Sequence, residues 1–338
     1  MNNISIIIPT RNRADVLSGT LSNISPLLLN DSRCELIIVD NGSSDATPVV
    51  AAQFVENHPR ANHVIEKKPG LLAGRHAGWR AATGDVLVFL DDDVHVGDNF
   101  LNAYREIFSN SSAVLAGGSN LPKFEAAPPL WLQTLWEPDQ SGLRVISELS
   151  ILDVPFLAPA EMSPYYVFGC NFAVRQDLLR DAGGFHPDGY PADLIRYRGD
   201  GETHIANYVA SNRLVTMFHP DASVFHLVPR SRMTLEYFKR RCFSEGVSYS
   251  FSRLREKFRH GGGNFKYYYK RLRNKLRFSN SGIRDLFSDV GPEFTTIDEL
   301  RKTFVRRGRD FHEFEFYNSG ELRKWVLQPN YINKDSPL

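Results

Sequence analysis

Runs of strand length alternate with amphipathic stretches over the first 91 residues of the chain. The runs are ISIII (4–8), CELIIVD (34–40), HVIEKK (63–68) and DVLVFLD (85–91). Between them lie three stretches whose apolar residues recur at helical spacing, residues 13–24, 43–58 and 71–84. Strands that alternate with helices are typical of an α/β layer fold with a parallel sheet. The pattern therefore predicts such a sheet in this part of the chain.

The pattern weakens between residues 111 and 160, where prolines are frequent and where Trp131 and Trp136 occur. We expect a long, partly ordered loop region with one short helix there. Regular elements return downstream of this region. They are a strand and a helix within 165–185, a helix at about 202–211 and a strand near 223–228.

The last third of the chain differs in charge from the rest. Residues 1–229 hold 16 Lys and Arg against 26 Asp and Glu, whereas residues 230–338 hold 24 against 13. Helical stretches rich in arginine and aromatic residues are predicted at 233–260 and 264–278.

This change in character predicts two parts, a domain at 1–230 and a basic, mainly helical C-terminal region at 231–338. Basic helices with aromatic residues can pack on the domain, lie on an anionic membrane surface or bind nucleic acid. We expect packing first and peripheral membrane contact second. Nucleic-acid binding is not expected, because the sequence has no recognised nucleic-acid-binding motif.

Neither a membrane span nor a disulfide framework is predicted. The longest apolar runs are far shorter than the roughly 20 residues that cross a bilayer. The first residues, MNNISIIIPTRNR, do not resemble a signal peptide, so we expect a cytoplasmic protein. The three cysteines, Cys34, Cys170 and Cys242, are widely spaced, which argues against disulfides and against a zinc site.

Polar residues follow three of the predicted strands, at Pro9–Asn12, Asp40–Asp45 and Asp91–Asp93. Ligands of open parallel sheets bind beyond the carboxyl ends of the strands, so these groups can converge. The chain has neither GxGxxG after its first strand nor GxxxxGK[ST]. A nicotinamide-dependent dehydrogenase and the usual nucleoside triphosphatases are therefore disfavoured.

The three adjacent carboxylates, Asp91, Asp92 and Asp93, offer another way to meet phosphate. Mg²⁺ and Mn²⁺ are held by one or two carboxylates together with the phosphates of a substrate. Alternate residues of an extended segment point the same way, so Asp91 and Asp93 should share a direction that Asp92 does not. The alternative is that the acids merely cap a turn.

Five segments of the chain together resemble glycosyltransferase family 2 over about residues 3–230. In order they are SIIIPTRNR, LIIVDNGSSDAT, KPGLLAGRHAGWRAATGDVLVFLDDDV, GCNFAVRQDLLRDAGGF and GDGETHIANYV. The resemblance implies an α/β GT-A fold, with a Rossmann-like, mostly parallel nucleotide-sugar-binding sheet followed by the helical C-terminal extension. It also implies inverting transfer from a nucleotide-diphosphate sugar, with a UDP-sugar expected, and Mn²⁺ or Mg²⁺ as cofactor. The acceptor would be a glycan or lipid-linked molecule of bacterial polysaccharide or glycoconjugate synthesis.

Carried over position by position, the resemblance assigns residues to the donor and to the metal. The donor-binding residues would be Pro9, Thr10, Arg11, Asn12, Asp40, Asn41, Lys68, Gly70, Arg75, Asp91 and Asp92. Asp93 and Asp91 match the outer carboxylates of the family's DxD motif, with Asp93 as the direct metal ligand. His226 would be an additional ligand, although a lone histidine is as often structural. The other nine histidines receive no role.

The family's general base comes from an acidic motif, usually Glu-Asp, at the start of a helix. This chain has Gly199-Asp200-Gly201-Glu202 instead, so the match is imperfect. Counting back without gaps from Pro220 places Glu202 on the family's catalytic aspartate. Asp200 remains the alternative, both acids can be needed, and both can instead be helix-capping residues.

Gly169 and Asn171 fall where the family lines the acceptor side. Trp131, with Trp136, could stack on an acceptor sugar or pack in the core. The family often has an acid after its Gly-Phe pair, where this chain has His186, so the acceptor contacts are open.

Two other functions fit the sequence less well than a glycosyltransferase does. A sugar nucleotidyltransferase would show a glycine-rich, basic loop after the first strand, which PTRNRAD does not provide. A catalytically silent, glycosyltransferase-like binding protein would have no need of Asp91, Asp93 and the acids at 200–202.

Overall fold

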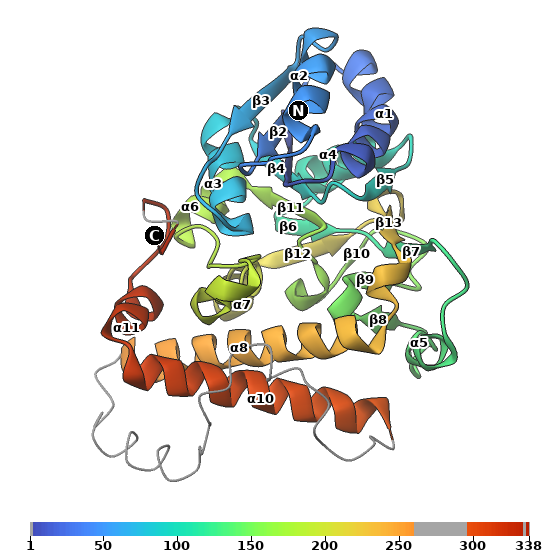
Figure 1. Ribbon diagram of the computed structural model, residues 1–338. Coiled ribbons are helices and arrows are strands. Elements are labelled where there is room, and N and C mark those ends of the chain that lie inside the picture. Colours follow the sequence, from blue (N-terminus) through green and yellow to red (C-terminus); the bar gives the residue numbers. More distant parts are fainter. Residues whose placement is uncertain (1–2, 260–295, 334–335, 338) are drawn as a thin grey trace.

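The computed structural model describes residues 3–259, 296–333 and 336–337. Eight strands form a main sheet in the order β10-β12-β6-β11-β4-β1-β2-β3 (Figure 1). They are β1 (Ile4–Thr10), β2 (Cys34–Asp40), β3 (Ala61–Ile65), β4 (Val86–Leu90), β6 (Ala113–Gly117), β10 (Ala160–Glu161), β11 (Asn171–Arg175) and β12 (Val215–Phe218). The strands β3, β2, β1 and β4 are parallel, as the alternation of strands and helices predicts. β11 is antiparallel to both β4 and β6, so the sheet is mixed beyond β4.

Helices cover both faces of the main sheet. They are α1 (Ala14–Asn30), α2 (Thr47–Glu56), α3 (Leu71–Ala81), α4 (Phe100–Asn110), α6 (Gln176–Asp181) and α7 (Thr203–Ser211). A further short helix, α5 (Leu130–Leu135), packs in a separate cluster with Ile146 and Ile151. In β1, Ile4, Ile6 and Ile8 share a buried cluster with side chains of α1, α2 and α4. Ile7 belongs to a second cluster, with side chains of α3, α6 and α7. Because successive residues of a strand point to opposite faces, a strand buried on both faces is a continuous apolar run in the sequence.

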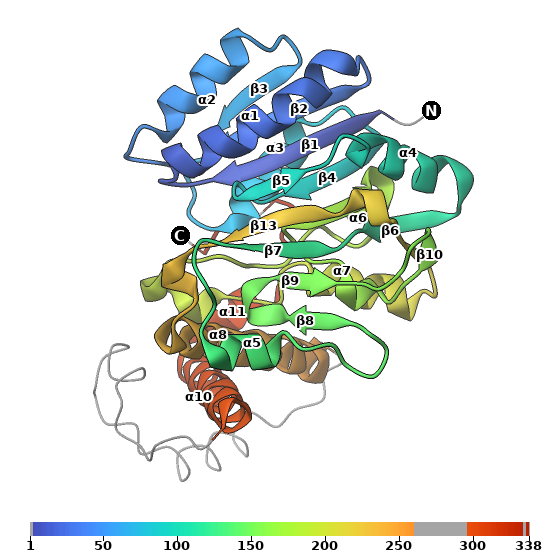
Figure 2. The ribbon, with the colours of Figure 1, turned by 90° about the vertical axis from the view of Figure 1, so that its right-hand side faces the viewer.

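A second, five-stranded sheet continues from the end of β4 in the order β5-β13-β7-β9-β8 (Figure 2). Its strands are β5 (Val94–Val96), β7 (Asn120–Phe124), β8 (Arg144–Ile146), β9 (Ile151–Asp153) and β13 (Val224–Val228). β13 is antiparallel to β5 and parallel to β7. This pairing brings a strand from late in the chain beside the residues that follow β4.

The prediction of a loop region at 111–160 was wrong. This segment contains β6, β7, β8, β9 and the start of β10, and only the short helix α5 was expected. The strands β5 and β12 were not predicted either. Each of these strands has two to five residues, and their partners include β11, β12 and β13, which lie far away in the sequence. Such pairing leaves no local periodicity, because tertiary context decides the state of a short strand.

In the described part of the chain, two long helices and one short helix follow the second sheet. They are α8 (Leu235–Arg259), α10 (Ile297–Asn318) and α11 (Gly320–Leu327). α8 lies within the helical stretch predicted at 233–260, and the stretch predicted at 264–278 lies outside the described residues. Among the described residues, no helix combines the length and apolar character that a membrane span requires.

The C-terminal helices pack against the main sheet and its helices. Phe251 of α8, Phe316 of α10 and Trp325 of α11 belong to the same buried cluster as Ile7 of β1. In both ribbon views α8 and α10 lie side by side (Figures 1 and 2). The described part of the C-terminal region thus shares a core with the domain.

Two glycines allow α8 and α10 to approach each other at the level of their backbones. A Cβ atom added to Gly246 would overlap the carbonyl oxygen of Val305. A Cβ atom added to Gly308 would overlap the carbonyl oxygen of Phe243. Both obstacles are backbone atoms, so a side chain at either position forces the helices apart.

We predict that Gly308→Ala lowers the stability of the protein by about 1–2 kcal/mol net, because overpacking against a backbone carbonyl should cost about 2–3 kcal/mol, the upper part of the usual range. This cost exceeds the helix-propensity gain of about 1 kcal/mol that alanine brings. The control is Gly320→Ala, whose added Cβ would meet only the end of the Arg323 side chain, at 3.5 Å. Thermal melting should give a lower midpoint for Gly308→Ala and an unchanged or higher one for Gly320→Ala. Equal midpoints would show that the close helix crossing is not required.

Candidate active site

The three carboxylates that follow β4 point in two directions. The Asp92 carboxylate accepts a hydrogen bond from the hydroxyl of Thr10 at 2.6 Å. Asp91 and Asp93 converge instead with His226 of β13, and one ligand atom from each of the three lies within 4.8 Å of the others. Asp91 and Asp93 thus share a direction, as the sequence predicts, but the backbone at Asp92 and Asp93 forms a turn between β4 and β5 and is not extended.

Two arginines partly neutralise this cluster. Arg13 contacts both Asp92 and Asp93. Its Nε lies 3.0 Å from Asp92 Oδ1 and its Nη2 lies 2.7 Å from Asp93 Oδ2. Arg232 Nη2 lies 3.0 Å from Asp93 Oδ2, and His226 Nε2 lies 3.2 Å from Asp93 Oδ1. Asp93 is therefore paired with one arginine from early in the chain and one from a much later segment.

The carboxylates of the cluster have different electrostatic surroundings. Burial, and next the charge of Asp93, raise the pKa of Asp91. Burial raises the pKa of Asp92 to about 7, although Arg13 opposes the shift. Burial alone would also raise the pKa of Asp93, but His226 and Arg232 hold it below its usual range. A divalent cation would favour the ionised form of every carboxylate here.

The chemistry of these side chains fits a divalent metal ion. Carboxylate oxygens are the preferred ligands of Mg²⁺ and Mn²⁺, and a neutral imidazole nitrogen can join them. Asp91, Asp93 and His226 supply such a set. The sequence pattern did not identify Arg13 or Arg232 as part of the site. The only signals were that Arg13 ends the PTRNR motif and that Arg232 follows His226 by six positions.

The predicted donor-binding residues lie on loops that are tied to one another. Asp40 accepts a hydrogen bond from the amide of Ser43 at 2.9 Å. The Asn12 side chain accepts one from the amide of Ser44 at 2.7 Å, which joins the loops after β1 and β2. Asn41 continues this chain of contacts. Its Nδ2 donates to the Lys68 carbonyl at 2.7 Å and its Oδ1 accepts from the Gly70 amide at 3.1 Å.

The remaining donor-side predictions differ in exposure. Pro9 packs against Gly74 of α3, where an added Cβ would lie 3.1 Å from the proline ring. Arg11 and Lys68 are exposed at the same edge of the sheet. The structure thus brings the ends of β1 and β2 and the start of α3 to one edge, next to the carboxylates that follow β4.

Arg75 connects this edge to Glu202. The Arg75 side chain is 4% exposed, and its Nη1 lies 3.1 Å from Glu202 Oε2. Its Nη2 donates to the carbonyl of Gly169 at 3.2 Å, and the Gly169 amide donates to Glu202 Oε1 at 3.1 Å. Burial alone would lower the pKa of Arg75, but the charges of Glu202 and Asp91 raise it. Arg75 therefore lies between the acidic turn and the cluster after β4.

Gly169 has to be glycine for this contact to form. A Cβ atom at position 169 would overlap the guanidinium of Arg75 and would lie 2.9 Å from Glu202 Oε1. Gly169, one of the residues assigned to the acceptor side, thus lies beside Glu202, a candidate general base.

The two acids of the predicted base motif have separate environments. The Glu202 side chain is 26% exposed, whereas that of Asp200 is 7% exposed. Asp200 accepts hydrogen bonds from His186 Nδ1 and from the hydroxyl of Ser252, each at 2.5 Å. Burial alone would raise the pKa of Asp200, but the charge and hydrogen bond of His186 lower it to about 2.

The other two predicted acceptor residues make contacts within the protein. Asn171 is buried, accepts a hydrogen bond from Tyr104 at 2.6 Å and donates to the Ala222 carbonyl at 2.8 Å. The ring of Trp131 lies 5.3 Å from that of Phe238, in a cluster that Trp136 also joins. The contacts of both side chains are therefore with other parts of the protein, and their roles in acceptor binding stay predictions.

Comparison with known proteins identifies a family match. The sequence profile described as Glycosyl transferase family 2 matches residues 5–179, just over half of the chain. The matched segment includes the strand ends at Thr10, Asp40 and Asp91–Asp93 and ends before Glu202.

Curated relatives match over part of their own length. Glycosyltransferase AglE of Haloferax volcanii is 31% identical over 117 residues, which are 34% of this chain and 38% of that protein. Pre-mycofactocin glycosyltransferase of Mycobacterium tuberculosis is 28% identical over 185 residues, which are 54% of this chain and 35% of that protein. The match thus spans little more than a third of the length of either relative.

A solved structure is similar over nearly the whole chain. It is the mannosyltransferase PcManGT from Pyrobaculum calidifontis in complex with GDP-Man and Mn²⁺, with a TM-score of 0.54 and 18% sequence identity. The similarity covers 94% of this chain and 87% of that one. At this identity it shows a shared fold, and the prediction of a GT-A fold is confirmed.

Proposed function

Because this chain belongs to glycosyl transferase family 2, we propose that it is an inverting glycosyltransferase that moves a sugar from a nucleotide-diphosphate sugar to an acceptor hydroxyl. The observation that carries the proposal is the convergence of Asp91, Asp93 and His226 at the carboxyl end of β4. The loops of the predicted donor site lie at the same edge of the sheet, and Arg75 connects that edge to Glu202.

Asp93 and Asp91, with His226, would hold Mn²⁺ or Mg²⁺. When bound, the ion acts as a Lewis acid that stabilises the charge of the leaving nucleoside diphosphate. Arg13 and Arg232 supply further positive charge at Asp93. The loops after β1 and β2 would bind the nucleoside, and Asp40 would accept hydrogen bonds from its nucleobase. A UDP-sugar remains the expected donor.

Glu202 is the proposed general base. It takes the proton of the acceptor hydroxyl while the hydroxyl oxygen forms a bond to the anomeric carbon. The bond from that carbon to the phosphate oxygen breaks, and its electron pair leaves with the nucleoside diphosphate. Arg75 and the Gly169 amide orient the Glu202 carboxylate, which is partly exposed. Asp200 is less suited to this role, because it is buried and both of its oxygens already accept hydrogen bonds.

The acceptor and the cellular location belong to the same proposal. A glycan or lipid-linked acceptor is proposed from the family resemblance. The basic region 231–338 would allow peripheral contact with an anionic membrane at its cytoplasmic side. We also propose that residues 1–230 form the catalytic domain. Side chains of α8, α10 and α11 pack in the core of that domain.

In the presence of Mn²⁺, Asp93→Asn should lower the affinity for the donor by at least about 10-fold, because the substitution deletes a charged metal ligand. The measurement is calorimetric titration of a nucleotide sugar with and without Mn²⁺. Asp98→Asn is the matched control, because it makes the same charge change at an exposed position shortly after the cluster. Equal Mn²⁺ dependence in wild type and Asp93→Asn would overturn the metal assignment.

Glu202→Gln should retain donor binding and lower kcat by roughly 10²–10⁴-fold, the range that general-base catalysis supplies. Single-turnover transfer assays and donor titration together provide the readout. Transfer at the wild-type rate would remove Glu202 from the role of base. Donor binding without transfer by the wild-type protein, over a screen of nucleotide sugars and acceptors, would favour the catalytically silent alternative.

A further inference from the structure

The turn that carries Glu202 is supported from behind by helix α8. The turn, Gly199–Glu202, precedes α7, and the amide of Gly199 donates to the Pro187 carbonyl at 2.8 Å. A Cβ atom at Gly199 would lie 2.9 Å from the ring of Phe251 in α8. Gly201 has a φ of 54°, in the left-handed region that favours glycine. The backbone of the turn is therefore pressed against α8 with no room for a side chain at 199.

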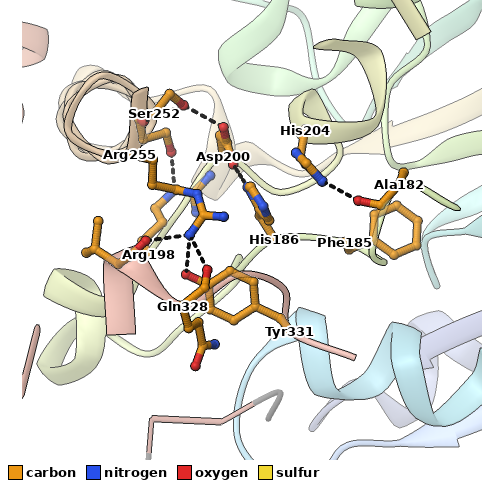
Figure 3. A network of polar contacts seen from close by, with 12 residues as sticks. Ala182, Phe185, His186, Arg198, Asp200, His204, Ser252, Arg255, Gln328 and Tyr331 are labelled. Atoms are coloured by element: carbon orange, nitrogen blue, oxygen red, sulfur yellow. Dashed lines mark hydrogen bonds and ion pairs between the residues drawn. The ribbon is translucent and has the colours of Figure 1, made fainter. Parts of the chain in front are cut away.

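Asp200 fastens this turn on two sides (Figure 3). His186 Nδ1 donates to its Oδ1, and the Ser252 hydroxyl of α8 donates to its Oδ2, each at 2.5 Å. The ring of His186 stacks on that of His204 in α7, with centroids 3.6 Å apart and planes 13° apart. His204 Nε2 in turn donates to the Ala182 carbonyl at 2.8 Å. Hydrogen bonds to an ionised, buried acceptor are among the stronger ones in proteins.

The end of the chain in turn fixes this part of α8. Arg255, one helical turn after Ser252, donates to the Gln328 carbonyl at 2.8 Å and also to the carbonyl of Val326. The ring of Tyr331 lies 5.3 Å from that of His186. Residues 326–331 thus contact both α8 and the histidine that pairs with Asp200.

We infer that Asp200, His186 and Ser252 form a clamp that positions the Glu202 turn, so that the C-terminal region completes the active site. Asp200 is then a positioning residue and Glu202 is the group that meets the acceptor. The inference rests on the proposed function, in which Glu202 is the base. It adds a role for Ser252, which lies beyond the segment that resembles the family and beyond the family match.

The buried state of Asp200 argues against its being the base itself. To accept a proton from an acceptor, Asp200 would have to release His186 or Ser252, and its side chain is only 7% exposed. The low pKa of the group, about 2, agrees with a carboxylate that stays ionised and paired.

The experiment compares three serine variants of the full chain. Ser252→Ala deletes the donor to Asp200, and Ser252→Thr restores a hydroxyl. Ser244→Ala is the matched control, since the Ser244 hydroxyl lies two turns earlier on α8 and, among the described residues, donates to the Arg240 carbonyl alone. Ser252→Ala should lower kcat about 10-fold or more, because a small misplacement of a catalytic group is costly. Donor affinity should be unchanged, Ser252→Thr should recover most of the rate, and Ser244→Ala should match wild type.

Hydrogen–deuterium exchange at residues 199–204 provides a readout that does not depend on activity. Ser252→Ala should speed exchange there and Ser244→Ala should not. Unchanged exchange in Ser252→Ala overturns the clamp, and so does faster exchange with an unchanged kcat. If the wild-type protein transfers no sugar, the proposed function fails, and exchange still decides whether the clamp exists.

Asp200→Asn separates the two acids. An asparagine oxygen still accepts from Ser252, so this variant should keep more activity than Glu202→Gln. If Asp200→Asn abolishes transfer as fully as Glu202→Gln while Ser252→Ala retains the wild-type kcat, Asp200 takes part in the chemistry itself and the inference is overturned.

Discussion

The need to balance three adjacent carboxylates at the end of a buried strand shapes this structure. Asp91, Asp92 and Asp93 follow β4 directly, and carboxyl groups as buried as those of Asp92 and Asp93 require charged or hydrogen-bonding partners. Arg13 comes from the loop after β1, and Arg232 comes from the turn after β13. The second sheet, which pairs β13 with β5, is what brings the later partners to the cluster.

A second ionic contact, between Arg75 and Glu202, forms beside Gly169. Arg75 is buried on α3 and pairs with Glu202, so the position of the acid depends on the packing of α3 and on the absence of a side chain at 169. The turn that bears Glu202 also rests on α8, whose approach to α10 depends on Gly246 and Gly308. The C-terminal helices therefore bear on the geometry of the site through packing.

The sequence allowed β1, β2 and β4 and the polar residues at their ends to be predicted, because each strand is a continuous apolar run followed by a turn. The separation of Asp91 and Asp93 from Asp92 was predicted from strand alternation, although the structure reaches it through a turn at Asp92 and Asp93. The short strands at 111–160 and the partners Arg13, Arg232 and Ser252 could not be predicted in the same way. Their roles depend on contacts between segments that are distant in sequence, and such contacts leave no periodic pattern. His186 was given no role for the same reason.

The central claim is that the carboxylates after β4 form a divalent-metal site for a nucleotide-sugar donor. A crystal structure of the protein soaked with Mn²⁺ and a nucleoside diphosphate tests it most directly, since manganese can be located by anomalous diffraction. We expect one manganese peak at coordination distance, about 2 Å, from Asp93, with Asp91 or His226 as a further ligand or neighbour. A nucleotide bound at the ends of β1 and β2 with no manganese near Asp93, or a manganese ion bound elsewhere, would contradict the claim.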